Sequence, residues 1–192
     1  MTIAPNPPIL KQYKPNDLNL KVLMDEHITF VKMGFGYSLM VRIKPGFVTD
    51  GASVPKERLW DDKDRAKIED FIKCKYSANP PREVIEDFIK KLIGTPWDMP
   101  RLLAAIVHDA LYSLHWWFRW LCDLVYIHIL SENGYDAIRG EIEHFCIRLV
   151  GWRNWNAVSK EEIRKTKELV SMAFVRTKKV AKIREQLIVG EM

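Results

Sequence analysis

The residues best suited to chemistry are His108, Asp109 and Tyr112, which directly follow the apolar run at residues 102–107. An imidazole, a carboxylate and a phenol are costly to bury unless they are paired, hydrogen-bonded or bound to a metal. We therefore expect this segment to serve either a structural polar network or a reaction.

Two other segments offer partners for these side chains. Upstream, residues 46–55 read GFVTDGASVP and contain Asp50 and Ser53, while Arg119 and Asp123 lie downstream. If one helix ran unbroken over residues 100–126, the helical repeat would place the polar side chains in a stripe along one face. If residues 113–118 instead form a turn, the same side chains lie on two adjacent helices that can face each other.

One chemistry that suits this set is metal-assisted hydrolysis. Asp50, His108, Asp109 and Asp123 would offer nitrogen and oxygen ligands for zinc, manganese or iron. The bound metal would activate a water molecule.

The second chemistry is general base catalysis. His108 would act as the base, and a carboxylate such as that of Asp109 would orient the imidazole ring. Tyr112 would contribute a neighbouring phenol. Ser53 would be the candidate nucleophile, but it lacks the GxSxG elbow, which argues against a serine hydrolase.

A purely structural interpretation competes with both chemistries, and the residues favour it because no third ligand stands at a fixed spacing. A buried His–Asp pair and an Arg–Asp pair can hold helices together and fix one packing. Asp50, before Gly51, can accept backbone N–H groups in a turn. Trp116, Trp117 and Trp120 suit core packing or a subunit interface better than a stacking surface for a ligand.

Composition sets limits on the class of protein. The 192 residues are 47% hydrophobic, which is typical of one folded domain with a real core. The net charge of +5 permits a nucleic-acid or anionic partner but supports it only weakly. The three cysteines show no CxxC spacing, so we expect reduced thiols, and residues 1–10 show no signal-peptide pattern. The apolar stretch at residues 115–130 carries Arg119 and Asp123, which indicates a buried helix and no membrane span.

Strand-like patterns come first along the chain and helix-like patterns follow, which predicts an α+β fold. In this fold a small N-terminal antiparallel sheet packs on a mainly α-helical C-terminal half. Residues 1–18 are rich in proline and predict an extended arm, and residues 19–152 predict a single domain. Within that domain we expect strands over 20–33 and 37–43, an inserted helical hairpin over 61–95, a helix that Pro100 opens and that carries His108, and helical regions over 118–130 and 135–150, the last ending at Gly151. Ser159 with Glu162 forms a capping box and predicts that residues 153–192 carry one long charged helix, to about residue 187.

Together the motif segments resemble a phage-associated family, the domain of unknown function 1353. That family pairs a Gly-Phe-x-Thr-Asp-x-x-Ser-x-Pro segment with a His-Asp-x-Leu-Tyr segment and then an Arg-x-x-Ala-Asp segment. The matching residues here are Gly46, Phe47, Thr49, Asp50, Ser53 and Pro55, then His108, Asp109, Leu111 and Tyr112, then Arg119 and Asp123, with Cys122 in place of the alanine. The match covers roughly residues 35–60 and 98–152, and the charged stretch at 61–95 departs from the pattern.

The resemblance implies a phage origin more than a mechanism. Our first hypothesis is a bacteriophage-associated structural or accessory protein, such as a tail or virion component, whose polar cluster is architectural. It would act in the virion or the host cytoplasm and bind other phage proteins or copies of itself. The alternative is a small metal-dependent hydrolase acting on cell-wall polymer or nucleic acid.

Overall fold

The computed structural model describes residues 10–14, 17–49, 62–76 and 99–190. Five strands come first: β1 (Leu10–Lys14), β2 (Asp17–Leu23), β3 (His27–Gly34), β4 (Tyr37–Ile43) and β5 (Val48–Thr49). The helices α1 (Asp62–Tyr76), α3 (Met99–Ser113), α4 (Arg119–Glu132), α5 (Ala137–Ala157) and α6 (Lys160–Leu169) follow. Strand β6 (Val170–Arg176) and helix α7 (Thr177–Gly190) complete this part of the chain.

The strands form two antiparallel sheets of three strands each. One has the order β1-β2-β5 and the other the order β3-β4-β6. The turn between β3 and β4 is Gly34-Phe35-Gly36, and all three residues have positive φ angles. Two glycines adopt that left-handed backbone without strain, so the predicted turn and the predicted strand over residues 37–43 are confirmed.

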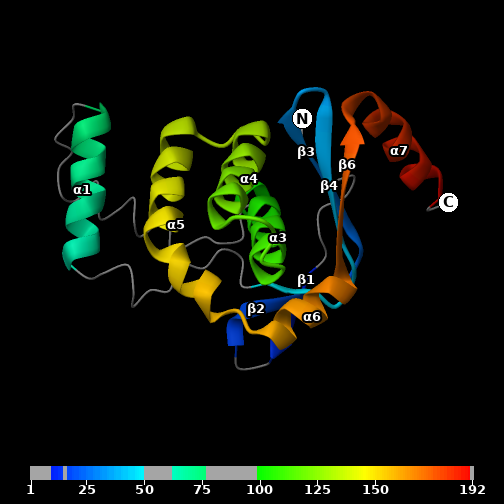
Figure 1. Ribbon diagram of the computed structural model, residues 1–192, viewed down its shortest axis with the longest axis horizontal. Coiled ribbons are helices and arrows are strands. Elements are labelled where there is room, and N and C mark those ends of the chain that lie inside the picture. Colours follow the sequence, from blue (N-terminus) through cyan, green and yellow to red (C-terminus); the bar gives the residue numbers. More distant parts are fainter. Residues whose placement is uncertain (1–9, 15–16, 50–61, 77–98, 191–192) are drawn as a thin grey trace.

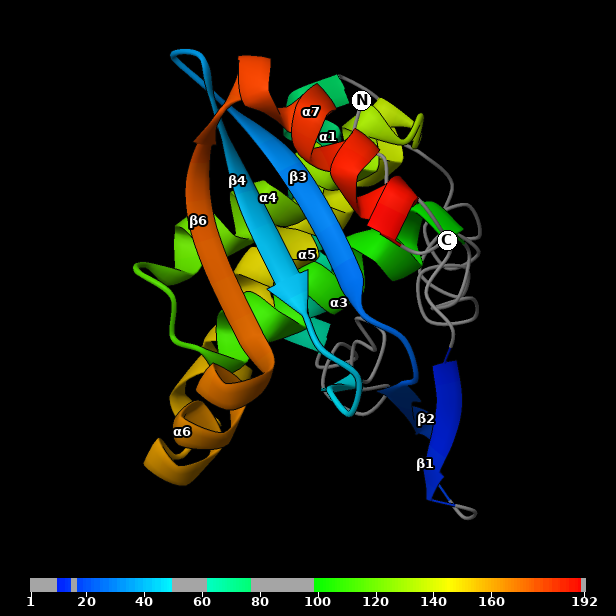
Figure 2. The same ribbon diagram turned by 90° about the vertical axis from the view of Figure 1, so that its right-hand side faces the viewer.

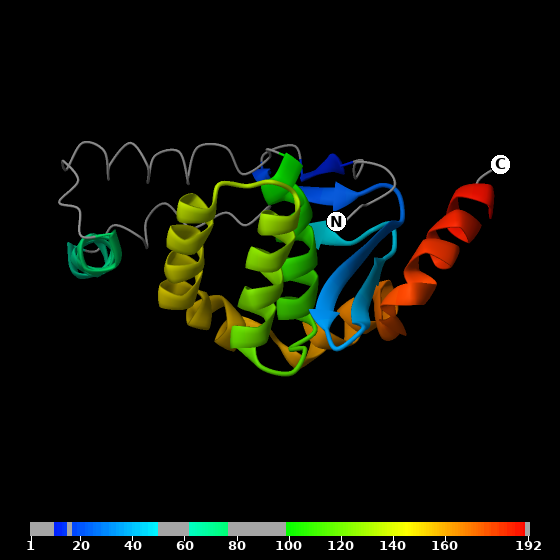
Figure 3. The ribbon, with the colours of Figure 1, turned by 90° about the horizontal axis from the view of Figure 1, so that it is seen from above.

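The β3-β4-β6 sheet lies between two helical layers (Figures 1 and 3). On one side, alternate residues of β4, namely Leu39, Val41 and Ile43, pack into the main apolar core with α3 and α4. On the other side, Ile28 and Phe30 of β3 pack with Val180 of α7. Because side chains alternate across a strand, burial of both faces makes this the central sheet of the fold.

The predicted α+β class is confirmed: antiparallel strands fill the N-terminal part and helices dominate the C-terminal part. The prediction of one long charged helix over residues 153–192 is wrong. Ser159 does cap a helix, since its Oγ accepts the N–H of Glu162 at 3.1 Å, but that helix ends at Leu169. Residues 170–176 then pair with β4 from Ile43 to Tyr37, so a strand near the C-terminus joins the sheet formed by β3 and β4.

Two other predicted boundaries are corrected, and one open alternative is decided. Helix α5 continues through Gly151 to Ala157. Residues 114–118 form a turn, so α3 and α4 are separate helices, as in the second of the two arrangements that the sequence left open. In the predicted arm, residues 10–14 form β1 and pair with β2, whereas residues 1–9 lie outside the described chain.

Helix α1 confirms the first of the two helices predicted over residues 61–95, and the second falls outside the described residues. It packs on α5 through a small apolar cluster, in which Ile68 and Ile72 meet Ile142 and Cys146. The rings of Phe71 and Phe145 stack there at 4.3 Å between centroids. This cluster is separate from the main core. None of the helices in the described ranges is long and apolar enough to cross a membrane.

A buried histidine on β3 makes stability depend on pH. Burial lowers the pKa of His27 from 6.5 to about 4, and its Nε2 lies 2.7 Å from Oγ1 of Thr29. Between pH 6.5 and 4 the unfolded chain therefore binds a proton that the folded chain does not. We expect the free energy of unfolding to fall by up to about 3 kcal/mol as pH drops through this range.

Urea unfolding at a series of pH values measures this effect, with His27→Gln as the non-titrating variant. The variant should show a clearly flatter dependence between pH 6.5 and 4. Equal slopes in the two proteins would show that His27 is not the group responsible.

Candidate functional site

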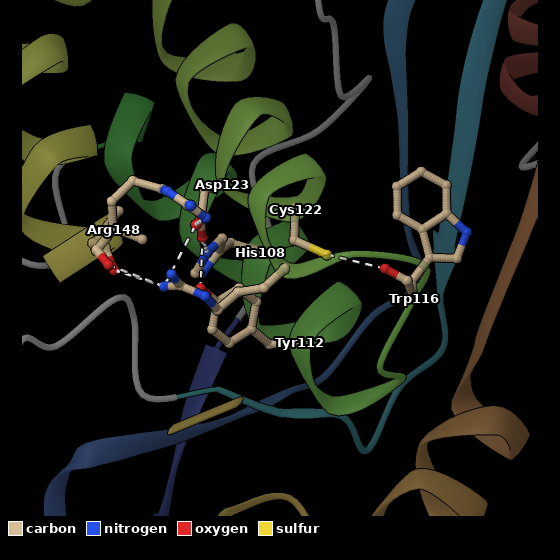
Figure 4. A network of polar contacts seen from close by, with 8 residues as sticks. His108, Tyr112, Trp116, Cys122, Asp123 and Arg148 are labelled. Carbon is tan, nitrogen blue, oxygen red and sulfur yellow. Dashed lines mark hydrogen bonds and ion pairs between the residues drawn. The ribbon is translucent and has the colours of Figure 1, made fainter. Parts of the chain in front are cut away.

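Three helices bring the candidate residues together in the interior. On α3, His108 and Tyr112 are four residues apart and share one face, and on α4 the same spacing joins Arg119 and Asp123. Arg148 comes from α5. We call these five residues the Asp123 cluster. Figure 4 shows His108, Tyr112 and Arg148 converging on Asp123.

Both carboxylate oxygens of Asp123 are occupied by donors. Oδ1 lies 3.1 Å from Nε2 of His108 and accepts the hydroxyl of Tyr112 at 2.5 Å. Oδ2 accepts Nη1 of Arg148 at 3.0 Å, and Nη1 of Arg119 lies 3.8 Å away as an ion pair. The side chain of Asp123 is 0% exposed. An ionised carboxylate offers about four lone-pair positions, and three hydrogen bonds occupy this one, two on Oδ1 and one on Oδ2.

The electrostatics keep this carboxylate charged. Burial alone would raise the pKa of Asp123, but hydrogen bonds from His108, Tyr112 and Arg148 outweigh burial and hold that pKa below its usual value. Burial and the charge of Asp123 raise the pKa of Tyr112 far above its usual value, so the phenol remains a donor. The cluster is therefore a charged acceptor surrounded by donors.

Arg119 also ties α4 to the backbone of α5. Its Nη1 donates to the carbonyl oxygens of Ile147 at 3.5 Å and of Arg148 at 3.2 Å. Such contact with a helix backbone requires a small residue nearby, and Gly151 provides it. A Cβ atom at Gly151 would lie 2.7 Å from the hydroxyl of Tyr112 and 3.3 Å from Nη1 of Arg119.

Substitution of Gly151 tests this close approach. In Gly151→Ala the added methyl would push Tyr112 away from Asp123, and we expect a loss of about 1–3 kcal/mol in the free energy of unfolding. Chemical denaturation measures it, with Gly140→Ala on the same helix as the control, because a Cβ atom there would be in ordinary contact at 3.8 Å. Equal effects of the two substitutions would contradict the packing described here.

The aromatic residues around the turn after α3 extend the cluster toward the end of α5. The rings of His115 and Trp155 stack at 4.4 Å, and Nε2 of His115 lies 2.7 Å from the carbonyl oxygen of Trp155. The ring of Tyr112 meets the same indole edge-on at 5.2 Å.

Cys122 donates to the carbonyl oxygen of Trp116 at 3.3 Å (Figure 4). Burial raises the pKa of this thiol to about 12, so Cys122 stays protonated and is not a nucleophile.

Asp109 is directed to a different partner from its neighbour His108. Its Oδ2 accepts a short hydrogen bond from Oγ1 of Thr49, which joins the end of β5 to α3. The predicted ligands His108 and Asp123 thus come together, whereas Asp109 serves the sheet–helix junction. Asp50 and Ser53 lie outside the described residues, so the prediction that Asp50 converges on His108 and Asp123 stays a prediction.

The described residues do not contain a complete metal site. Among them, no three His, Cys, Asp or Glu side chains gather closely enough to hold a metal ion. His108 and Asp123 supply two of the ligands needed, and tetrahedral zinc sites in catalysis use three protein ligands.

A second buried polar group, the Glu143 cluster, consists of Arg101, Tyr126, Tyr135 and Glu143 and was not predicted from the sequence. Oε1 of Glu143 lies 3.1 Å from Nε of Arg101 and also accepts the hydroxyl of Tyr135, and Oε2 accepts the hydroxyl of Tyr126 at 2.8 Å. Both side chains of the ion pair are at most 4% exposed. Two features of the sequence could have indicated this cluster. Arg101 directly precedes the apolar residues 102–107, and Glu143 directly follows Ile142, so each charge lies beside apolar residues in a helix.

The two clusters touch through one pair of rings. His108 and Tyr126 meet edge-on at 5.4 Å between centroids. Burial, followed by the charge of Glu143, raises the pKa of Tyr126 well above its usual value, so this phenol also remains a donor. Together the two clusters form one continuous group of polar side chains between α3, α4 and α5.

Comparisons of the chain with protein-family models, curated proteins and solved structures found no match.

Proposed function

We propose that this chain is a bacteriophage-associated structural or accessory protein in which the Asp123 cluster holds the helical half together. The observation that carries the proposal is the occupation of the buried Asp123 carboxylate, which accepts three hydrogen bonds and has the Arg119 guanidinium 3.8 Å away as an ion pair. A carboxylate that already accepts three hydrogen bonds from protein side chains is poorly suited to bind a substrate or a catalytic water. The phage association rests on the three matching motif segments alone.

Exposed aromatic residues support a binding role for the protein. Trp117, Phe118 and Trp120 remain largely exposed around the start of α4, and the rings of Phe118 and Trp120 stack at 6.4 Å. Large exposed apolar side chains that gather on a surface are typical of protein-contact sites. The partners proposed are other phage proteins or copies of the same chain, and the proposed location is the virion or the host cytoplasm.

One observation favours the hydrolase as a second candidate. The hydrogen bond between Thr49 and Asp109 holds the end of β5 against α3, one residue from His108 along the helix. Asp50 directly follows Thr49. A metal-dependent hydrolase acting on cell-wall polymer or nucleic acid would use Asp50 as the further ligand beside His108 and Asp123, with zinc or manganese as the metal.

Elemental analysis of the purified full chain separates the two candidates. The structural proposal expects no stoichiometric zinc or manganese after exposure to either metal, and a large loss of stability in both His108→Ala and Asp123→Ala. Stoichiometric metal that is lost in both variants would overturn it in favour of the hydrolase. Mass spectrometry of purified phage particles tests the virion role, and detection only in infected-cell lysate would count against it.

A further inference from the structure

Strand β6 forms one edge of the β3-β4-β6 sheet. It pairs with β4 on one side, and no strand of the described chain pairs with its other side (Figure 2). An edge strand presents a row of N–H and C=O groups that can pair with another strand. The question is which residues present these groups and what they fit.

Two printed backbone bonds determine which residues face outward. Lys44 donates to the carbonyl of Leu169, and Thr177 donates to the carbonyl of Gly36, so residues 169 and 177 turn their backbone groups toward β4. In an antiparallel ladder this orientation alternates along the strand. The outward N–H and C=O groups therefore belong to Val170, Met172, Phe174 and Arg176.

The sequence of β6 does not protect this edge. Native edge strands are commonly blocked by proline, bulges or inward-pointing charges. Strand β6 reads VSMAFVR, without proline or glycine and with a single charge at its last residue. Beside it, Phe174 is 48% exposed and Trp117 is 59% exposed, and their rings lie 5.8 Å apart.

We propose that two copies of this chain form a dimer by pairing their β6 strands antiparallel about a two-fold axis at Ala173. This register engages all four outward-facing residues. Met172 lies opposite the partner's Phe174, and Val170 lies opposite the partner's Arg176. Both three-stranded sheets then continue as one six-stranded sheet, and the Met172–Phe174 pairs place a thioether against an aromatic ring on the face that carries Trp117.

The charges at the two ends of β6 fit this register. Arg176 ends the strand and Lys178 follows it, and Glu168 precedes the strand at the exposed end of α6. The antiparallel two-fold brings the basic end of one protomer beside the acidic residue of its partner. A parallel arrangement would set Arg176 against the partner's Arg176, which is unfavourable.

Sedimentation equilibrium of the full chain tests the association. We expect a mass twice the 22.5 kDa of the single chain. Phe174→Lys should halve the measured mass, because it replaces an apolar cross-strand contact by a charge. Phe35→Lys is the matched control, since Phe35 is fully exposed at the β3–β4 turn and lies outside β6, and it should leave the dimer intact. A monomeric wild type, or equal behaviour of the two variants, would overturn the proposal.

Cysteine cross-linking tests the register itself, in a Cys74→Ser background because Cys74 is the exposed native thiol. In Ala173→Cys the two new thiols would face each other across the axis, with Cα atoms about 4.5 Å apart, within reach of a disulfide. In Ser171→Cys the equivalent atoms would be about 13 Å apart along the strand, too far to bridge. We expect a disulfide-linked dimer for Ala173→Cys and none for Ser171→Cys. Equal cross-linking, or none in either variant, would overturn this register.

Discussion

Replacing Asp123 with alanine is expected to lower the free energy of unfolding by about 3–5 kcal/mol. The substitution removes the only described acceptor that His108, Tyr112 and Arg148 share, and it leaves buried donors without a partner. Loss of fixed packing between α3, α4 and α5 should accompany the change. Urea denaturation followed by tryptophan fluorescence measures both effects, because the Trp155 indole meets the ring of Tyr112 edge-on.

A matched control separates this effect from a general loss of charge. Glu161 forms ion pairs with Arg164 and Lys165 on the exposed face of α6, and its removal in Glu161→Ala should leave stability nearly unchanged. An Asp123→Ala variant as stable as Glu161→Ala would contradict the structural role assigned to the cluster.

Replacing Glu143 with alanine is expected to have a comparable effect, a loss of about 3–5 kcal/mol. Glu143 pairs with Arg101 in a site where both side chains are almost fully buried, and it accepts hydroxyls from Tyr126 and Tyr135. Its removal would take away a buried counter-charge of Arg101 and the acceptor of two buried hydroxyls. Thermal and urea unfolding both measure this loss.

The control for Glu143 is again Glu161→Ala, which removes an exposed carboxylate paired with Arg164. We expect it to unfold at nearly the same urea concentration as the wild type. A small effect of Glu143→Ala, matching that of Glu161→Ala, would mean that the Glu143 cluster adds little to the stability of the helical half.

The sequence predicted the parts of the fold that depend on local patterns. The strand at residues 37–43 alternates apolar and polar side chains, and the turn before it carries two glycines. The meeting of His108 with Asp123 was likewise predictable, because both lie on helical faces at regular spacing. Such short-range signals determine an element before any tertiary contact forms.

Long-range contacts account for what was missed. Residues 170–176 lie between a well-capped helix and a lysine-rich segment, so helical signals surround them on both sides. Their strand conformation depends on pairing with β4, more than 120 residues earlier in the chain. Gly151 resembles a helix-ending glycine, whereas its role comes from the close approach of Tyr112 and Arg119. The Glu143 cluster joins residues of three separate helices and the turn before α5, a relation that no local pattern records.

The most direct test of the central claim is a double-mutant cycle on stability at the pair His108 and Asp123. If the pair holds α3 to α4, then His108→Ala and Asp123→Ala should each destabilise the protein. The double variant should lose less than the sum of the two single losses, with a coupling of about 1 kcal/mol or more. Residues kept for chemistry often leave stability unchanged or raise it when they are replaced. Single variants as stable as the wild type, or more stable, would contradict the structural account of this cluster.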